Sequence, residues 1–169
     1  MELKWQVQIV SGLQQIHYPN EPPDSDLLVC IGTDEADNMQ GTSSDDAMNG
    51  LRGDDTMFGF AGNDFVTGGP GDDTMNGGSG DGQMDGREGN DNINGDSGHD
   101  IILGGTGADI LKGSSGNDLI SHFFSGVTPS RPDGSKDTID CGSGTDDRAW
   151  INVSRDGDTA VNCETVVAG

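Results

Sequence analysis

The stretch "GGPGDDTMNGGSGDGQMDGREGNDNIN", residues 68–94, repeats itself every nine residues. Each of its three units begins with glycine, has glycine again at the fourth place, and has Met or Ile at the eighth. Two units carry aspartate at the sixth place, Asp73 and Asp91, whereas the middle unit carries Gly82 there. A fixed short period of this kind indicates a repeat architecture in which every unit is one small structural element.

The period extends without insertion from Gly32 to Ser121, which gives ten units of nine residues. Place one is always glycine, place four is glycine except at Glu35 and Ser44, and place six is aspartate except at Gly82. Place eight is always aliphatic or Met: Met39, Met48, Met57, Val66, Met75, Met84, Ile93, Ile102, Leu111 and Ile120.

These columns predict an all-β fold. Glycines at places one and four permit the positive φ angles and close backbone approaches of a tight turn. Places seven to nine form a polar–apolar–polar triplet, which is one short strand with its middle side chain pointing inward. Two units, about 18 residues, return the chain to its starting side. The sequence therefore predicts a right-handed parallel β-roll, a solenoid of about ten nonapeptide repeats whose alternate units lie on opposite faces.

The charge balance points to cations as ligands. The formal net charge is −22 and the hydrophobic share is only 30%, so nucleic acid and anionic membranes are unsuitable partners. One aliphatic side chain per unit does not offset the entropy lost in ordering nine residues. Stacking also places the aspartates of alternate units above one another, where like charges repel. Carboxylates and turn carbonyls in a flexible loop favour Ca²⁺ over Mg²⁺ and softer metals.

The ten units resemble the GGxGxDxUx consensus of the RTX (hemolysin-type) calcium-binding repeats. The resemblance implies Ca²⁺ ions between successive loops at each edge of the roll, and folding that depends on calcium. Five loops at each edge leave four gaps, so about eight ions are expected. Asp81, one place earlier, is a candidate to replace the carboxylate missing at Gly82, and the sequence leaves open whether it does. The candidate calcium ligands are Asp37, Asp46, Asp55, Asp64, Asp73, Asp81, Asp91, Asp100, Asp109, Asp118, Asp137 and Asp146.

Two flanking regions complete the predicted organisation: an N-terminal leader or cap over residues 1–31 and a C-terminal loop and cap over residues 122–169, around the roll at 32–121. "WQVQIV" reads as a strand of the leader, and "LLVC", residues 27–30, as the start of the roll. In the C-terminal region "AWINV" and "TAVNCETVV" predict a capping hairpin around an "RDGD" turn.

The three cysteines leave one thiol unpaired within the chain. Cys141 and Cys163 flank the predicted hairpin, and the sequence leaves open whether they form a disulfide or are two buried thiols. Cys30 is expected to pack under the first coil.

No HExxH, GxSxG or Walker A motif occurs, so we expect no enzymatic activity. The leading hypothesis is a calcium-binding protein of the extracellular space or cell surface. The sequence shows no Sec-type signal and no membrane span, and the resemblance favours export by a type I secretion machinery. One alternative is an adhesion or ice-binding protein that displays Thr and Asn side chains on one face. Another is the secretion and folding module of an exported enzyme or toxin.

Overall fold

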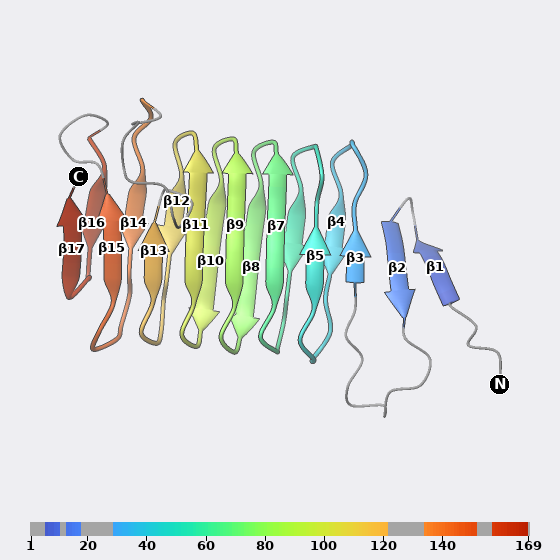
Figure 1. Ribbon diagram of the computed structural model, residues 1–169, viewed down its shortest axis with the longest axis horizontal. Helices are drawn as coiled ribbons and strands as arrows, with labels where there is room; N and C mark the ends of the chain where they lie inside the picture. The colour runs from blue at the N-terminus through green and yellow to red at the C-terminus, as the bar shows by residue number, and fades with distance from the viewer. Residues whose placement is uncertain (1–5, 11–12, 18–28, 122–133, 152–156, 169) are drawn as a thin grey trace.

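The computed structural model describes residues 6–10, 13–17, 29–121, 134–151 and 157–168, and every element in these ranges is a β-strand. The strands form two sheets that face each other along an elongated roll (Figure 1). No helix in the described part of the chain is long and apolar enough to cross a membrane.

Sheet A has ten strands in the order β1-β2-β3-β5-β7-β9-β11-β13-β15-β17, and sheet B has seven in the order β16-β14-β12-β10-β8-β6-β4. The strands of sheet A are β1 (Gln6–Val10), β2 (Leu13–His17), β3 (Val29–Ile31), β5 (Ala47–Asn49), β7 (Phe65–Pro70), β9 (Gln83–Glu88), β11 (Ile101–Thr106), β13 (Leu119–Ser121), β15 (Arg148–Ile151) and β17 (Thr165–Ala168). Those of sheet B are β4 (Asn38–Gln40), β6 (Thr56–Phe58), β8 (Thr74–Ser79), β10 (Asn92–Ser97), β12 (Ile110–Lys112), β14 (Thr138–Asp140) and β16 (Thr159–Val161).

The register of the strands confirms the predicted β-roll. Successive units alternate between the two sheets, and each strand pairs in parallel with the strand two units later. For example, Met75 of β8 pairs with Met57 of β6 on one side and with Ile93 of β10 on the other side. Two nine-residue units therefore make one coil. The roll continues beyond the ten regular units, because β14 to β17 extend both sheets by further parallel pairings.

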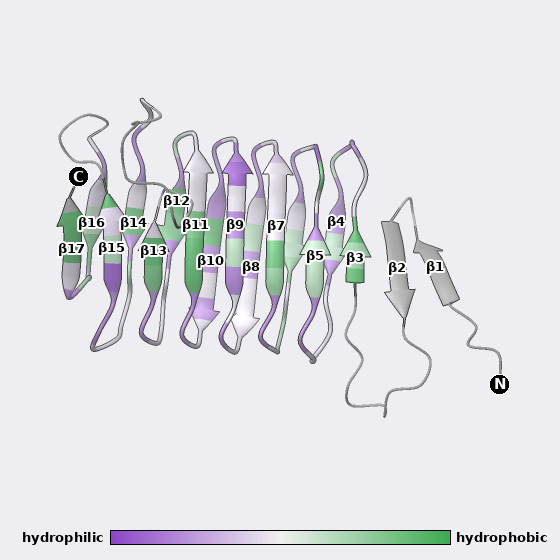
Figure 2. Cartoon of the chain, viewed as in Figure 1, coloured by the Kyte–Doolittle hydropathy of each residue, from purple (hydrophilic) through white to green (hydrophobic). Residues whose placement is uncertain are grey.

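The core is one side chain thick per strand. All ten place-eight residues are buried, and Cys30, Ile139 and Ala149 continue the same column in the coils before and after them. Figure 2 shows apolar colour across parts of β7, β11 and β13, whereas many of the connecting loops are coloured as hydrophilic. A core of this thickness leaves most of the chain, including the loops at both edges, outside any apolar interior.

The turn glycines divide into two kinds. Place four has positive φ, for example 118° at Gly53 and 122° at Gly107, as the sequence predicts. The second positive φ lies at place two, where Leu51, Phe60 and Arg87 adopt it without being glycine. The place-one glycines from Gly32 to Gly113 do not have positive φ. Glycine therefore recurs at place one for another reason, which is the position of the neighbouring carboxylates described below.

The C-terminal region does not contain the predicted hairpin. β15 and β16 do not pair with each other: β15 pairs in parallel with β13 and β17 in sheet A, and β16 pairs in parallel with β14 in sheet B. The open edges of the preceding coils offer both strands a parallel partner, so β14 to β17 continue the roll as four further half-coils. A disulfide joins Cys141 to Cys163 in these last turns, which decides the question that the sequence leaves open. The predicted loop at 122–133 lies outside the described residues.

The N-terminal strands close one end of sheet A. β1 and β2 form an antiparallel hairpin, and β2 pairs antiparallel with β3, which in turn pairs in parallel with β5. β1 matches the strand predicted from "WQVQIV", and β2 was not predicted. Cys30 in β3 is fully buried and has a free thiol, as expected for the first strand of the roll.

Candidate metal centre

Carboxylates form one row along each edge of the roll, in the loops that Figure 1 shows above and below the strands. Each row consists of the residues that immediately precede the strands of one sheet, which in the regular units is place six. We call them the 37–158 row, which precedes the strands of sheet B, and the 46–164 row, which precedes those of sheet A from β5 onward. The 37–158 row contains Asp37, Asp55, Asp73, Asp91, Asp109, Asp137 and Asp158; the 46–164 row contains Asp46, Asp64, Gly82, Asp100, Asp118, Asp147 and Glu164.

Backbone hydrogen bonds hold each row in register. The amide N–H of one member donates to a carboxylate oxygen of the next, as Asp55 N does to Asp73 Oδ1 at 2.8 Å and Asp100 N to Asp118 Oδ1 at 2.9 Å. The pattern runs from Asp37 to Asp158 in the first row. In the second row it runs from Asp46 to Glu164, except at Gly82, which has no carboxylate to offer to Asp64. Beyond the first member of each row, one oxygen of every carboxylate is thereby fixed between two coils.

The other carboxylate oxygen lacks a hydrogen-bond donor. Its position is buried, and no protein group in the described residues donates to it in the following members of the rows: Asp55, Asp64, Asp73, Asp91, Asp100, Asp118 and Asp147. A buried anionic oxygen without a partner carries a large desolvation cost. A series of them at equivalent positions indicates that the rows are built for a cation.

The place-one glycines make room for these oxygens. A methyl group on Gly50 would overlap Asp55 Oδ2 of its own loop and the carbonyl oxygen of Gly68 in the next coil. Gly68 is related in the same way to Asp73 and Gly86. At Gly50 and Gly68 the space over the place-one Cα is therefore shared by a carboxylate oxygen and a backbone carbonyl oxygen. Both are hard oxygen ligands of the kind that Ca²⁺ takes in flexible loops.

Burial and mutual repulsion raise the pKa values of four buried row members. Burial is the main cause, and it raises the pKa of Asp73 to about 7 and that of Asp91 to about 8, with neighbouring row carboxylates adding to the shift. The pKa values of Asp64 and Asp100, on either side of Gly82, rise only to about 6. The larger of these shifts thus belong to two successive members of the 37–158 row, Asp73 and Asp91.

The first member of each row differs from the others. Thr33 N donates to Asp37 Oδ2 at 2.6 Å, and Thr42 N donates to Asp46 Oδ2. These are the two units without glycine at place four. In these two units an amide of the same loop donates to the carboxylate oxygen that has no donor in Asp55 and Asp64.

The gap at Gly82 is filled by an apolar group. A methyl group on Gly77, the place-one glycine of this unit, would lie 3.2 Å from Met84 Cε and 3.4 Å from Met84 Sδ rather than against a carboxylate. The end of the Met84 side chain therefore takes up part of the space that the missing aspartate would use.

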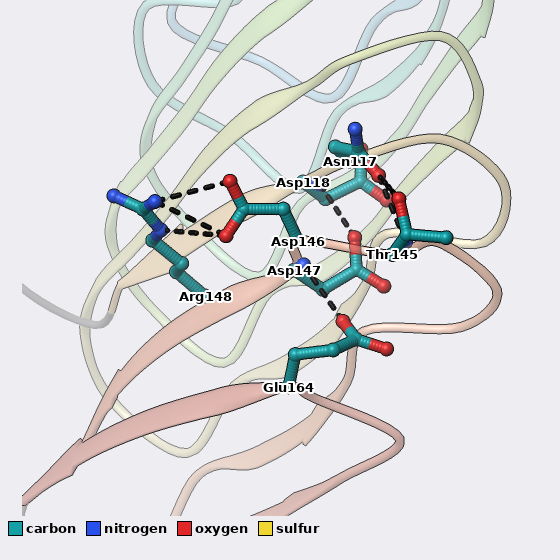
Figure 3. Close-up of polar contacts among 7 residues, drawn as sticks. All are labelled: Asn117, Asp118, Thr145, Asp146, Asp147, Arg148 and Glu164. Atoms are coloured by element: carbon teal, nitrogen blue, oxygen red, sulfur yellow. Dashed lines mark hydrogen bonds and ion pairs between the residues drawn. The ribbon is translucent and has the colours of Figure 1, made fainter.

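Two of the predicted ligands lie outside the rows. Asp81 is exposed, and its Oδ1 accepts a hydrogen bond from His99 N at 2.8 Å in a separate ladder of place-five residues, one place before the row position at Gly82. Asp146 is also exposed and forms a 3.0 Å ion pair with Arg148 (Figure 3). The loop before β15 contains one extra residue, which moves the row position from Asp146 to Asp147, whose Oδ1 accepts from Asp118 N at 2.7 Å.

Sequence reasoning did not identify three row members: Asp147, Asp158 and Glu164. Each precedes a short strand by one residue, as the place-six aspartates do, which is the signal that could have identified them. The irregular spacing of the last loops hid this signal, because a search in steps of nine places the ligand at Asp146. The other predicted ligands, from Asp37 to Asp137, all lie in the rows.

Cations in these rows would rely on backbone oxygens. Among the described residues no three His, Cys, Asp or Glu side chains gather in the way that a side-chain metal site requires. Each gap offers the carboxylates of its two loops and the carbonyl groups of the turns, a set that excludes zinc-type sites and fits calcium.

The comparison with family models agrees with this chemistry. The RTX calcium-binding nonapeptide repeat matches residues 31–66, 61–84 and 85–120. Together these segments span the regular units and more than half of the chain. A search of curated proteins found no match. The matched segments coincide with the coils that carry the buried carboxylate rows, and the chain therefore belongs to the family of RTX calcium-binding nonapeptide-repeat proteins.

Proposed function

We propose that the two rows hold Ca²⁺ between successive loops and that, at pH values where the row carboxylates are ionised, the roll reaches its folded state only when calcium binds. The observation that carries this proposal is the series of buried Oδ2 atoms without donors, from Asp55 to Asp147. Without a cation each coil brings buried like charges together, and the thin core cannot offset that cost. A divalent ion between two loops removes the repulsion and supplies the missing partner.

The residues that would hold the ions are the row carboxylates and the carbonyl oxygens of the turns, such as that of Gly68 beside Asp55. Within the ten regular units two edges of five loops have four gaps each, so we propose about eight ions. Sites shared between loops exist only after two coils have stacked, so binding and folding are cooperative. Their affinity belongs to the class of extracellular calcium modules, which are half-saturated at roughly 0.1–1 mM calcium.

We further propose that the protein has no enzymatic activity and acts outside the cell or at its surface. The support is the fold: the described residues make a continuous roll in which the acidic groups repeat at every coil, whereas catalysis requires one distinct cleft. Export of the unfolded chain through a type I secretion machinery, followed by folding in external calcium, is consistent with an acidic chain that depends on a cation.

Native mass spectrometry tests the binding proposal. We expect the wild-type chain to bind about eight Ca²⁺ ions at millimolar calcium and far fewer Mg²⁺ ions, since Mg²⁺ retains its water. Asp91→Asn removes a buried row carboxylate and should lower the number of bound ions. Asp81→Asn is the matched control, because Asp81 is exposed in the neighbouring ladder. Equal calcium counts for the two variants would contradict the assignment of the rows.

The alternative of a display surface has less support. The outer face of sheet B aligns Thr56 with Thr74, and Thr74 with Asn92, which a regular Thr/Asn array requires. The next position in the same column is Ile110, which is 46% exposed, so the array does not continue. Thermal hysteresis of the calcium-loaded protein would be the result that favours an ice-binding role.

A further inference from the structure

We propose that the outer face of sheet B around Phe60 binds a short stretch of an uncharged glycan, a function separate from calcium binding. Two observations carry this inference. An aromatic pair is exposed on this face, and a neighbouring amide side chain, that of Asn76, has no hydrogen-bond partner within the described residues. Neither group is needed for the carboxylate rows or for the core.

Two phenylalanines form an aromatic surface at the end of β6. Phe58 is the last residue of the strand and Phe60 lies in the loop after it, with ring centroids 6.3 Å apart and ring planes inclined by 27°. Phe60 is 51% exposed. The core uses neither ring, because Met57 fills the inward position of β6. An exposed ring that a second ring holds in place offers its face to a ligand.

The next coil has no side chain beside Phe60. Ser79 N donates to Phe60 O at 2.7 Å, which places Gly78 next to Phe60, and Gly78 pairs in turn with Asp96 of β10. A methyl group on Gly78 would overlap the carbonyl oxygen of Phe60. The Cα atoms of Phe60 and Asp96 are therefore two strand spacings apart, about 9.6 Å. The place of one side chain between them is open.

Polar groups border this open place. Asn76 of β8 pairs with Phe58 on one side and with Asn94 on the other, and its unpartnered amide lies between them. Asn94 Oδ1 accepts from Ser114 Oγ at 2.8 Å, and Asn94 Nδ2 donates to Asp96 Oδ1 at 2.6 Å. This chain of hydrogen bonds fixes the Asp96 carboxylate and leaves its Oδ2 as an acceptor.

A sugar ring has the chemistry that this arrangement fits. Its C–H groups form an apolar face that stacks on an aromatic ring. Its hydroxyl groups both donate and accept, so they match an amide and a carboxylate together. We place the sugar ring over Gly78, with its C–H face against Phe60 and its hydroxyl groups towards Asn76 and Asp96.

The charge of this face selects an uncharged glycan. Although the formal net charge is −22, the eight outward residues that flank the core column in the first four strands of sheet B are uncharged. They are Asn38, Gln40, Thr56, Phe58, Thr74, Asn76, Asn92 and Asn94. Asp96 beside the open place repels the carboxylate of an acidic sugar. A short glycan spans only three coils, so it does not need the Thr/Asn column to continue to Ile110.

Affinity gel electrophoresis of the calcium-loaded protein tests the site. The gels contain an uncharged polysaccharide (hydroxyethylcellulose, laminarin or mannan) or the anionic hyaluronan. We expect at least one uncharged polysaccharide to slow the wild-type protein and hyaluronan to have no effect. Phe60→Ala removes the stacking ring and Asn76→Ala removes the amide, and each should weaken binding by about ten-fold. Phe65→Ala is the matched control, because Phe65 is also 51% exposed but lies on sheet A.

The outcomes locate the site, with far-UV circular dichroism in calcium to confirm that each variant is folded. Slower migration of the wild type and of Phe65→Ala, together with its loss in Phe60→Ala and Asn76→Ala, supports the proposal. Wild-type migration that no uncharged polysaccharide changes would overturn it. Equal binding by the wild type and Phe60→Ala, or stronger retention by hyaluronan, would also overturn it. A calcium count on the same wild-type protein separates this failure from a failure of the proposed function.

Discussion

Glycine at place one has a different physical basis from glycine at place four. Place four needs glycine for its positive φ, whereas place one needs it because a Cβ would occupy the space of a carboxylate oxygen and a carbonyl oxygen. Place two adopts positive φ even with Leu51 or Phe60, at a cost of about 1–2 kcal/mol for each such residue. The positive φ at place two of each loop is therefore imposed by the packing of the whole coil and not by the residue type.

Gly86→Ala and Gly82→Ala should differ in their effect on stability. At Gly86 the new methyl group would overlap Asp91 Oδ2 and the carbonyl oxygen of Gly104, so we expect a loss of about 1–3 kcal/mol in the free energy of unfolding in calcium. At Gly82 the nearest atom would be Asp100 Oδ1 at 3.2 Å, and the loss should be smaller. Chemical denaturation in calcium measures both. A larger loss at Gly82 would refute this explanation.

Gly82→Asp should restore the 46–164 row. The backbone there does not have positive φ, and the flexible end of Met84 can move away from the new side chain. The new carboxylate would accept a hydrogen bond from Asp64 N and supply a ligand between Asp64 and Asp100, which we expect to add about 1 kcal/mol of stability in calcium. Calcium titration should show a lower midpoint. Gly82→Asn, similar in shape but neutral, is the control, and identical midpoints for all three proteins would count against a ligand role at this position.

At the scale of single elements, the disulfide closes a loop that contains β15 and β16. Cys141 and Cys163 are 22 residues apart, and closing a loop of this length stabilises a protein by roughly 3 kcal/mol. We expect a reductant to lower the thermal unfolding temperature of the wild-type protein in calcium. The Cys163→Ser variant, which lacks the bond, should unfold at the lower temperature with or without reductant. A wild-type temperature that does not respond to reductant would refute this prediction.

The carboxylate rows should make the calcium-free protein sensitive to pH. Burial raises the folded-state pKa of Asp64 and Asp100 to about 6, of Asp73 to about 7 and of Asp91 to about 8, all above the ordinary value of 3.8. A raised pKa means that the folded state binds the proton more tightly than the unfolded state. The stability from these groups is complete below about pH 4 and is lost as the pH rises through 6 to 8.

Circular dichroism in EGTA between pH 4.5 and 8.5 tests this direction. We expect the β-sheet signal to decrease as the pH rises in EGTA, and to remain constant across the same range in millimolar calcium, because Ca²⁺ replaces the protons. A calcium-free signal that increases with pH would contradict the assigned pKa shifts.

Regular elements were predictable from the sequence, and irregular ones were not. The nine-residue period from Gly32 to Ser121 sets the strand positions, the alternation between sheets and the buried column. Beyond Ser121 the spacing between row members changes from 18 residues to 28, 29, 21 and 17, so Asp146 was predicted where Asp147 stands. The short strands β15 and β16 were predicted to pair with each other because they are neighbours in sequence. They pair instead with β13 and β14 of the earlier coils, because those strands form the open edges of the two sheets. The local sequence of β15 and β16 does not reveal these edges.

For the whole molecule, the acidic composition and the thin core have one common explanation. A formal charge of −22 would oppose any compact state, and about eight divalent ions would offset most of it. The two rows run along the full length of the roll, so every stacked coil adds both apolar contacts and a shared gap for an ion. Calcium is thus expected to act on the fold as a whole, with cooperative binding.

Far-UV circular dichroism during a calcium titration at pH 8 tests this central claim most directly. We predict little β-sheet signal in EGTA and a cooperative gain of signal as free calcium rises into the millimolar range, with no equivalent gain in magnesium. A full β-sheet signal in EGTA that does not change on addition of calcium would contradict the account.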